Sequence, residues 1–304
     1  MRIAVVGAGA LGGFYGAMLA HAGYDVHFLM RRDYQTVKQN GLMVHSCRGD
    51  FHLPRVNCYQ DVHEIGPVDL VLIGLKTTAN DKYEQLISPL LSARTTLLTA
   101  QNGLGNEELL AQLFDARRVA GGLAFLCVNR RAEGIIDHLD YGFMHIGNFQ
   151  RGPDEKLRRL AQMLNNSHVD GKIVENLALD RWKKLVWNVP FNGLSALLDQ
   201  TTDKLVTHPE LRRRAWRLMK EVQAGAHAYH LEIGDDFLDL MMSYTEKMKP
   251  YKSSMQLDRQ ARRPMEIDSI IAEPLRRSQA KGLDQPEMQT LYQQLSELDR
   301  ANTL

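Results

Sequence analysis

Three polar residues stand one helical turn apart in an otherwise apolar stretch near the middle of the chain. Lys184, Asn188 and Asn192 are spaced i, i+4, i+8, which places them on one face of a helix predicted at 181–198. Amide side chains among Trp, Val and Phe are costly unless they find polar partners. Two interpretations follow. The residues form a polar stripe facing solvent or another domain, or they direct an ammonium and two amides into a cleft between domains.

Two later groups have the residue types that would complete such a site. Ser253 and Ser254 precede a short helical pattern, and Glu266 begins another. A serine is also typical of a helix N-cap, and a glutamate of a first helical turn. The functional interpretation is that a carboxylate and Lys184 meet across a cleft, an arrangement suited to proton transfer to a reacting carbonyl.

The N-terminal stretch has the pattern of a dinucleotide-binding turn. A β-branched run at 2–6 leads into Gly7-Ala8-Gly9-Ala10-Leu11-Gly12, and a helical pattern follows. In this motif the first glycine allows a sharp turn, the second lets the backbone approach a pyrophosphate, and the third lets helix and strand pack closely. The N–H groups at the start of the helix then face the phosphates.

The end of the second predicted strand indicates which dinucleotide binds. An acidic residue is usual there, because it accepts hydrogen bonds from the adenosine ribose. Here the strand ends at Met30 and is followed by Arg31 and Arg32. A guanidinium pairs with a 2′-phosphate that a carboxylate would repel, so the sequence favours NADP(H) over NAD(H). An arginine pair on the surface is the alternative.

The predicted elements form an α/β fold. Strands and helices alternate in the first half, with near-continuous apolar strands at 69–75 and 95–99, a helix at 80–91, a hairpin at 41–56, and an antiparallel pair at 134–138 and 143–146. This order predicts an N-terminal Rossmann-type, doubly wound, mostly parallel sheet. Helical spacing dominates later, so we expect an NADP-binding domain at 1–170 and an all-helical substrate and catalytic domain at 171–304. Ligands of such sheets bind beyond the carboxyl ends of the strands, where Lys76 and Asn102 stand.

Composition narrows the class of protein. The net charge of +1 gives no field for nucleic acid or an anionic membrane, and 44% apolar residues suffice for a sizeable core. Cys47, Cys58 and Cys127 are widely spaced, which predicts neither a metal site nor a disulfide framework. The longest apolar run, 119–128, is too short to span a bilayer, and the early first strand leaves no room for a signal peptide. We therefore expect a soluble cytoplasmic protein.

With these motifs in place, the chain resembles the ketopantoate reductase family (2-dehydropantoate 2-reductase) over nearly its whole length. The glycine turn is shared with many dehydrogenases, whereas the Lys184/Asn188/Asn192 stripe followed by Ser-Ser-Met and Glu-Ile-Asp is far more specific. The residues that carry the resemblance are Gly7 to Gly12, Arg31, Lys76, Gln101-Asn102-Gly103, Gly134, His138, Gly142, Gly147, Lys184, Asn188, Asn192, Ser253-Ser254-Met255 and Glu266-Ile267-Asp268.

The resemblance implies NADPH-dependent reduction of a 2-oxo acid, with ketopantoate giving pantoate for pantothenate and coenzyme A synthesis. It also implies the roles of the matching positions. Arg31 contacts the 2′-phosphate, Lys76 lies near the same cofactor, and Asn102 lies at the nicotinamide and substrate end. Lys184 is the general acid, Asn188, Asn192 and Ser254 bind substrate, and Glu266 contacts the substrate hydroxyl.

The chain departs from the family pattern beside these positions. Ser254 is followed by Met255-Gln256-Leu257-Asp258, where the family commonly has Met-x-Gln-Asp. Met265 stands where threonine is frequent, and Ala272 where glycine is usual. Since neighbouring residues set which 2-oxo acid fits, a reductase of another branched 2-oxo acid is an alternative, as is a non-catalytic NADP(H)-binding sensor. An intact lysine and glutamate argue against the sensor. A homodimer is compatible with the sequence, which does not fix the oligomeric state.

Overall fold

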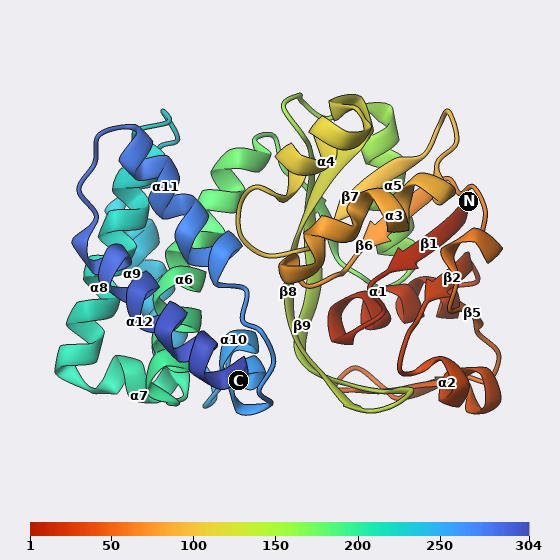
Figure 1. Cartoon of the computed structure of the whole chain (residues 1–304), viewed down its shortest axis with the longest axis horizontal. Helices are drawn as coiled ribbons and strands as arrows, with labels where there is room; N and C mark the ends of the chain where they lie inside the picture. The colour runs from red at the N-terminus through yellow and green to blue at the C-terminus, as the bar shows by residue number, and fades with distance from the viewer. Residues whose placement is uncertain (304) are drawn as a thin grey trace. The chain divides into compact units, whose positions relative to one another are not determined.

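The computed structural model describes residues 1–303 and divides the chain into two compact units (Figure 1). The first unit comprises Met1–Asn102 and Asn106–Leu177, and the second comprises Gly103–Gly105 and the chain from Ala178 onward. Among the described residues, all strands lie in the first unit, and the second unit is helical. The α/β class, with a Rossmann-type N-terminal unit and a helical C-terminal unit, is therefore confirmed.

The first unit is built on one ten-stranded sheet with the order β4-β3-β9-β8-β7-β6-β1-β2-β5, and β10 pairs with β9. The run from β5 to β8 is parallel, whereas β8–β9 and β3–β4 are antiparallel. The strands are β1 (Arg2–Val6), β2 (Asp25–Leu29), β3 (Leu42–Ser46), β4 (Phe51–Leu53), β5 (Asn57–Tyr59), β6 (Leu70–Ile73), β7 (Thr96–Thr99), β8 (Val119–Ala132), β9 (Ile135–Asn148) and β10 (Gly171–Ile173).

The central strands are buried on both faces. In β1, Ile3 and Val5 belong to one hydrophobic cluster, while Ala4 and Val6 belong to another. Successive side chains of a strand point to opposite faces, so each face of the sheet is covered by its own core. The helices and 3₁₀ segments of this unit are α1 (Ala10–His21), α2 (Tyr34–Asn40), η1 (Val62–Glu64), η2 (Thr77–Lys82), α3 (Tyr83–Ile87), η3 (Ser88–Leu90), α4 (Asn106–Phe114), η4 (Ala116–Arg118) and α5 (Glu155–Asn166).

Two predicted elements of the first unit are wrong. The segments 134–138 and 143–146 are not an antiparallel pair, because both lie in the single long strand β9, which pairs with β8. Tyr141 and Gly142 have φ values of 61° and 106°, and the register shifts nearby, so a bulge lets the strand continue where the sequence indicated a turn. The helix expected at 80–91 is divided into η2, α3 and η3, with Ala79 non-helical and Pro89 in the last turn.

The boundary expected near residue 170 also differs from the division in the structure. Gly171–Ile173 forms β10, which pairs in parallel with Met144–Ile146 of β9, and this pairing keeps the segment in the first unit. A strand of three residues has too little periodicity to be found in the sequence.

The second unit packs its helices around a separate hydrophobic core that includes Trp182, Phe191 and Leu291. Its elements are α6 (Leu177–Leu198), α7 (Thr202–Thr207), α8 (Pro209–His227), α9 (Asp235–Lys247), α10 (Ser254–Gln260), the π-helix η5 (Asp268–Ala272), α11 (Glu273–Ala280) and α12 (Pro286–Thr303). Within residues 1–303, no helix is long and apolar enough to cross a membrane.

Candidate functional site

The glycine turn of the first unit has the geometry that a pyrophosphate requires. Gly7 has φ +94°, and a Cβ there would lie 2.3 Å from the backbone nitrogen of Leu75. A Cβ on Gly12 would lie 2.3 Å from the carbonyl oxygen of Gly7, so neither position accepts a side chain. A Cβ on Gly9, by contrast, would meet nothing within 4 Å, which leaves the approach to the backbone open.

Helix α1 begins at this turn without an internal partner for its first N–H groups. Gly9 is its N-cap residue and has no side chain, and the first turn contains no acidic residue. The exposed N–H groups and the positive end of the helix dipole therefore suit an anion. These residues fit a dinucleotide.

The other candidates in the first unit follow the carboxyl ends of neighbouring parallel strands. Arg31 comes after β2, Lys76 after β6, and Asn102 after β7. Because β2, β1, β6 and β7 are adjacent and parallel, these residues lie along the same edge of the sheet as the glycine turn. We call this edge, with Gly7 to Gly12, the nucleotide edge.

Arg31 and Arg32 are both exposed, and within residues 1–303 neither guanidinium has a hydrogen bond or ion pair. The nearest acidic residue in sequence, Asp33, is buried and pairs with Arg130. A carboxylate held in this way leaves the exposed guanidinium of Arg31 available to a phosphate group.

In the second unit, α6 carries Lys184, Asn188 and Asn192. Lys184 is partly buried, while Asn188 and Asn192 are only 5% and 4% exposed. Within the described residues, neither amide side chain makes a hydrogen bond to another protein group. Buried amides normally have partners, so these two retain donors and acceptors for a ligand. We call Lys184, Asn188 and Asn192 the Lys184 face.

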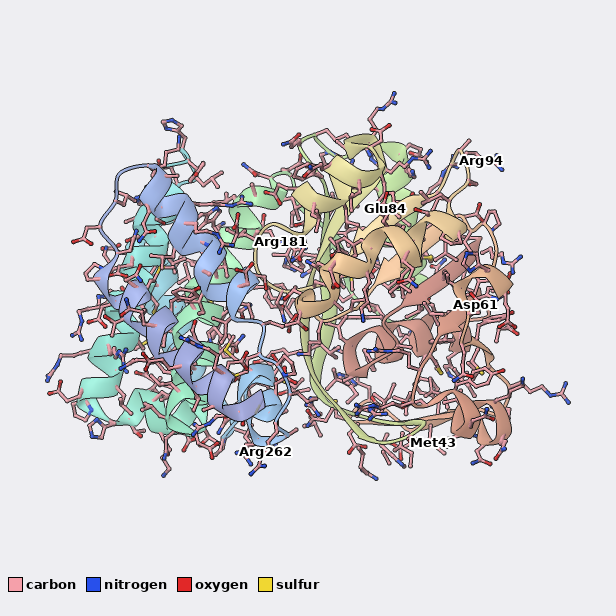
Figure 2. All side chains as sticks on the ribbon, in the orientation of Figure 1. Met43, Asp61, Glu84, Arg94, Arg181 and Arg262 are labelled. Carbon is pink, nitrogen blue, oxygen red and sulfur yellow. The ribbon has the colours of Figure 1, made fainter. Side chains whose placement is uncertain are left out.

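The environment of Lys184 brings its proton affinity into the range needed for catalysis near neutral pH. Burial and, to a lesser extent, the positive charge of Arg181 lower its pKa to about 7, against the opposing effect of the negative charge of Glu266. Arg181 lies three residues earlier on α6 and is labelled in Figure 2. Its role was missed in the sequence, although its i−3 spacing from Lys184 is a signal that could have revealed it.

Lys183 differs from its neighbour in what it contacts. Its Nζ atom lies 5.7 Å from the centre of the Phe237 ring, a cation–π contact within the second unit. Adjacent lysines on one helix thus have separate environments, and Lys183 provides a matched control for Lys184.

Glu266 is buried, at 5% exposure, and stands immediately before an irregular helical segment. The preceding residue, Met265, donates its backbone N–H to Asp299 Oδ1 at 3.0 Å. The carbonyl of Glu266 accepts from Ile270 N at 3.3 Å. The backbone on both sides of the carboxylate is therefore held, and this carboxylate acts electrostatically on Lys184.

The π-helix η5 after Glu266 has a chemical cause. Glu273 donates its N–H to Asp268 O, five residues back, and the next residue is Pro274, which has no N–H. Pro274 therefore cannot donate to the carbonyl oxygen of Ser269, five residues back. That oxygen accepts instead from Leu104 N at 2.9 Å, a bond within the second unit.

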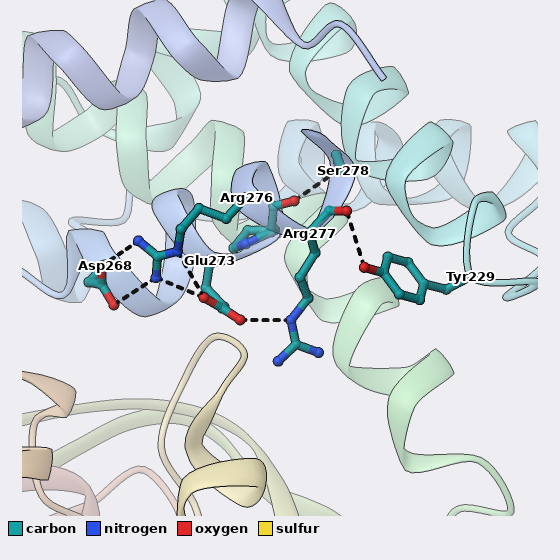
Figure 3. A network of polar contacts seen from close by, with 7 residues as sticks. Tyr229, Asp268, Glu273, Arg276, Arg277 and Ser278 are labelled. Atoms are coloured by element: carbon teal, nitrogen blue, oxygen red, sulfur yellow. Dashed lines mark hydrogen bonds and ion pairs between the residues drawn. The ribbon is translucent and has the colours of Figure 1, made fainter. Parts of the chain in front are cut away.

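A charged network stabilises the same segment (Figure 3). The guanidinium of Arg276 donates to both oxygens of Asp268, at 2.9 and 3.2 Å, and to Glu273 at 2.7 Å. Arg277 donates to the other oxygen of Glu273 at 2.8 Å. Asp268 and Glu273 mark the two ends of the π-turn, so Arg276 bridges it.

The two serines before α10 have different surroundings. Ser253 is fully buried and is the N-cap residue, since its hydroxyl accepts from Gln256 N at 3.2 Å. It also shares a 2.6 Å hydrogen bond with the Ser195 hydroxyl, which donates to Asn192 O at 3.3 Å. Ser254 is partly exposed and has no such capping bond. The capping interpretation therefore applies to Ser253, and Ser254 remains the substrate candidate.

A glycine turn on a Rossmann-type sheet, together with a partly buried lysine and a buried glutamate on a helical unit, defines a dinucleotide-dependent oxidoreductase. A family model described as ketopantoate reductase PanE/ApbA matches residues 3–151, and its C-terminal counterpart matches residues 176–299. A 2-dehydropantoate 2-reductase from Nostoc sp. is 42% identical, with the match covering 99% of this chain and 96% of the relative. The chain belongs to the ketopantoate reductase family.

Solved structures agree with this assignment. A 2-dehydropantoate 2-reductase from Geobacter metallireducens has a TM-score of 0.96 and 47% identity, covering 98% of this chain and 99% of its own. The corresponding enzyme from Methylococcus capsulatus has a TM-score of 0.91 and 31% identity, covering 100% and 98%. A D-mandelate dehydrogenase solved with NADH and anilino(oxo)acetate has a TM-score of 0.91 at 21% identity, which shows a shared fold.

Proposed function

We propose that this protein reduces a 2-oxo acid to a 2-hydroxy acid with NADPH, and that 2-dehydropantoate is the substrate and pantoate the product. The observation that carries the proposal is the Lys184 face. An ammonium whose pKa is about 7 lies on the same helix face as two buried amides that have no hydrogen-bond partner among residues 1–303, and Glu266 acts on it electrostatically. The names of the relatives support the choice of substrate.

Each of these residues would have a separate role in the reaction. Bound NADPH supplies the hydride. The Lys184 ammonium donates a hydrogen bond to the keto oxygen and then its proton to the alkoxide that forms there. Asn188, Asn192 and Ser254 hold the carboxylate and hydroxyl of the substrate, and the Glu266 carboxylate accepts a hydrogen bond from the hydroxyl.

At the nucleotide edge, the glycine turn would hold the pyrophosphate, Arg31 the 2′-phosphate, and Lys76 another part of the cofactor. Asn102 would contact the nicotinamide and the substrate. The preference for NADPH rests on the guanidinium of Arg31, which is exposed and has no partner in the part of the chain that the structure describes. A homodimer and a cytoplasmic location stay predictions.

A different branched 2-oxo acid is the second candidate substrate. It is favoured by Leu257 and Met265, where the sequence departs from the family pattern. Leu257 is partly buried and lies three residues after Ser254, and Met265 is buried and directly precedes Glu266. A change of shape at such positions alters which side chain of the substrate fits.

The test is an assay of nicotinamide absorbance with a panel of 2-oxo acids, each with NADPH and with NADH. We expect ketopantoate and NADPH to give the highest kcat/KM. A higher value with another 2-oxo acid would move the assignment to the second candidate. No turnover with any of them would refute the reductase and leave an NADP(H)-binding sensor.

Lys184→Ala should lower kcat by about 10²–10⁴-fold, the usual contribution of a general acid. NADPH should still bind, because the substitution lies in the second unit and the glycine turn in the first. Lys183→Ala is the matched control and should retain near-normal kcat. If Lys184→Ala also retained it, the assigned role would be wrong.

A further inference from the structure

A chain of hydrogen-bonded amides in the first unit ends on the backbone of Asn102. Gln101 Nε2 donates to Asn80 Oδ1 at 2.8 Å, Asn80 Nδ2 donates to Asn106 Oδ1 at 2.9 Å, and Asn106 Nδ2 donates to the carbonyl oxygen of Asn102 at 3.0 Å. At the other end, the hydroxyls of Tyr83 and Thr99 donate to Gln101 Oε1, the second at 2.8 Å. We call these residues the amide chain.

The direction of every bond in the amide chain follows from its last acceptor. The backbone carbonyl of Asn102 only accepts, so the group of Asn106 that faces it must be the NH₂. Asn106 Oδ1 must then accept from Asn80 Nδ2, whose own oxygen must accept from Gln101 Nε2. The oxygen of Gln101 is left to accept from the two hydroxyls. If the oxygen and the NH₂ group of any one amide were exchanged, two oxygens or two NH₂ groups would face each other and that hydrogen bond would be lost.

The amide chain is placed where polar groups are expensive unless they are matched. Tyr83, Thr99, Gln101 and Asn106 are all buried. Aligned bonds in a medium of low dielectric constant reinforce one another, and a broken one leaves unpaired polar atoms. Such an arrangement specifies a single backbone conformation for the segment on which it ends.

The amide chain also joins two parts of the nucleotide edge. Asn80 lies in η2, whose N-cap residue is Lys76, and Ala79 N donates to Lys76 O at 2.9 Å. Gln101 and Asn106 flank Asn102, between the end of β7 and the start of α4. The bond between Gln101 and Asn80 therefore ties the segment after Lys76 to the segment that contains Asn102.

We propose that Asn80, Gln101 and Asn106 are positioning residues, which act through the backbone of Asn102 to set its place relative to Lys76. This proposal rests on the proposed function, because it assigns the amide chain to the cofactor and substrate contacts of Asn102. The role was not visible in the sequence, where the residues are 21 and 26 positions apart.

Asn106→Asp is the most informative variant. Aspartate has the same shape and still accepts from Asn80, but an ionised carboxylate cannot donate to Asn102 O. A negative charge in the first turn of α4 is compatible with the helix dipole, which favours a folded variant. Asn57→Asp, the same change at the exposed first residue of strand β5, is the matched control.

Two readouts test the proposal. Hydrogen exchange followed by mass spectrometry should show faster exchange in peptides that cover residues 101–107 of Asn106→Asp, without cofactor. kcat/KM for the 2-oxo acid should fall on the order of 10–100-fold, since small misplacements of a contacting group have effects of this size. Asn57→Asp should change neither quantity. Asn80→Asp, which opposes Asn106 Oδ1 with a second oxygen, should resemble Asn106→Asp and replaces it if that variant does not fold.

A double-mutant cycle with Asn102→Ala separates positioning from a general loss of structure. If Asn106 acts through Asn102, Asn106→Asp should have little further effect on kcat/KM in the Asn102→Ala background. Equal penalties in both backgrounds, or unchanged exchange at residues 101–107, would overturn the proposal. If the unmodified protein turned over no 2-oxo acid, the proposed function would fail. The positioning role would then be tested by hydrogen exchange and by the affinity for NADPH. Unchanged values of both in Asn106→Asp would refute it, and changed values would support it.

Discussion

At the scale of single residues, the environment of a side chain decides more than its type. Lys183 and Lys184 are neighbours on α6, yet one contacts an aromatic ring, and burial and charge lower the pKa of the other to about 7. The same holds for Ser253 and Ser254, of which the first caps a helix. The sequence pattern identifies two adjacent residues of the same type as candidates. Their contacts in the folded protein show which of the two has the functional environment.

Arg181→Gln should shift the pH dependence of kcat. The charge of Arg181 lowers the pKa of Lys184, so its removal should raise that pKa. The general acid works in its protonated form, so reduction slows as pH rises through the Lys184 pKa. The alkaline limb of kcat against pH should therefore move from about 7 to higher pH. Arg181→Lys keeps the charge and should leave the limb near its original place; an unmoved limb in Arg181→Gln would contradict the assignment of the limb to Lys184.

Arg31→Asp should weaken NADPH binding far more than NADH binding. A charge-assisted hydrogen bond contributes about 1.5–3 kcal/mol, which corresponds to roughly a 10–150-fold change in Kd for the phosphorylated cofactor. Fluorescence titration with both cofactors measures the ratio. Arg32→Asp is the control at the neighbouring exposed position. Equal losses for NADPH and NADH would remove the argument for 2′-phosphate recognition.

At the scale of helices and strands, the site depends on where elements begin and end. The nucleotide edge follows the carboxyl ends of β1, β2, β6 and β7. Glu266 stands before the π-helix η5, which ends where Pro274 lacks an N–H. Helix α10 begins at Ser253, whose hydroxyl reaches the carbonyl of Asn192 through Ser195. The N-terminus of α10 is thus linked by hydrogen bonds to the part of α6 that carries Asn192.

Ser253→Ala and Ser254→Ala should affect different properties, the first the stability of the protein and the second the binding of substrate. Loss of the cap at Ser253 should lower the free energy of unfolding by about 1–2 kcal/mol, measured by denaturant unfolding. Ser254→Ala should leave stability nearly unchanged and raise KM for the 2-oxo acid. A raised KM only in Ser253→Ala would show that the substrate contact has been assigned to the wrong serine.

At the scale of the whole molecule, two units have separate hydrophobic cores. The clusters of the sheet contain residues up to Val169, and the cluster of the helical unit runs from Trp182 onward with Leu104 added. All three tryptophans, Trp182, Trp187 and Trp216, belong to the second unit. Tryptophan fluorescence therefore reports on that unit alone, while hydrogen exchange in β1 and β6 reports on the sheet.

NADP⁺ should stabilise the two units unequally. At 100 times its Kd, a ligand that binds only the folded state adds about 2.7 kcal/mol to the unit that holds it. We expect the opening free energy of β1 and β6, from native-state hydrogen exchange, to rise by this amount and the unfolding transition of tryptophan fluorescence to shift less. Equal shifts of both probes would show that the chain unfolds as one cooperative unit.

The sequence by itself determined the class of fold and most of the candidate residues. Glycine spacing, apolar strands and the i, i+4, i+8 stripe are local patterns, and local patterns survive in a linear sequence. Arg31 next to a strand end was equally visible. The long strand β9 was not, because the bulge at Tyr141 and Gly142 gives the local signal of a turn while pairing with β8 keeps the strand intact.

The tertiary structure alone decided the electrostatic and hydrogen-bonding relations between distant residues. The pKa of Lys184 depends on burial and on Glu266, far away in the sequence. The carbonyl of Ser269 finds its donor at Leu104, and the amide chain joins Asn80, Gln101 and Asn106. Such contacts form only when the chain folds, because no spacing rule relates residues on different elements. The spacing of the Lys184 face could be predicted from the sequence. The pKa of about 7, which suits Lys184 to act as a general acid, comes from the folded structure.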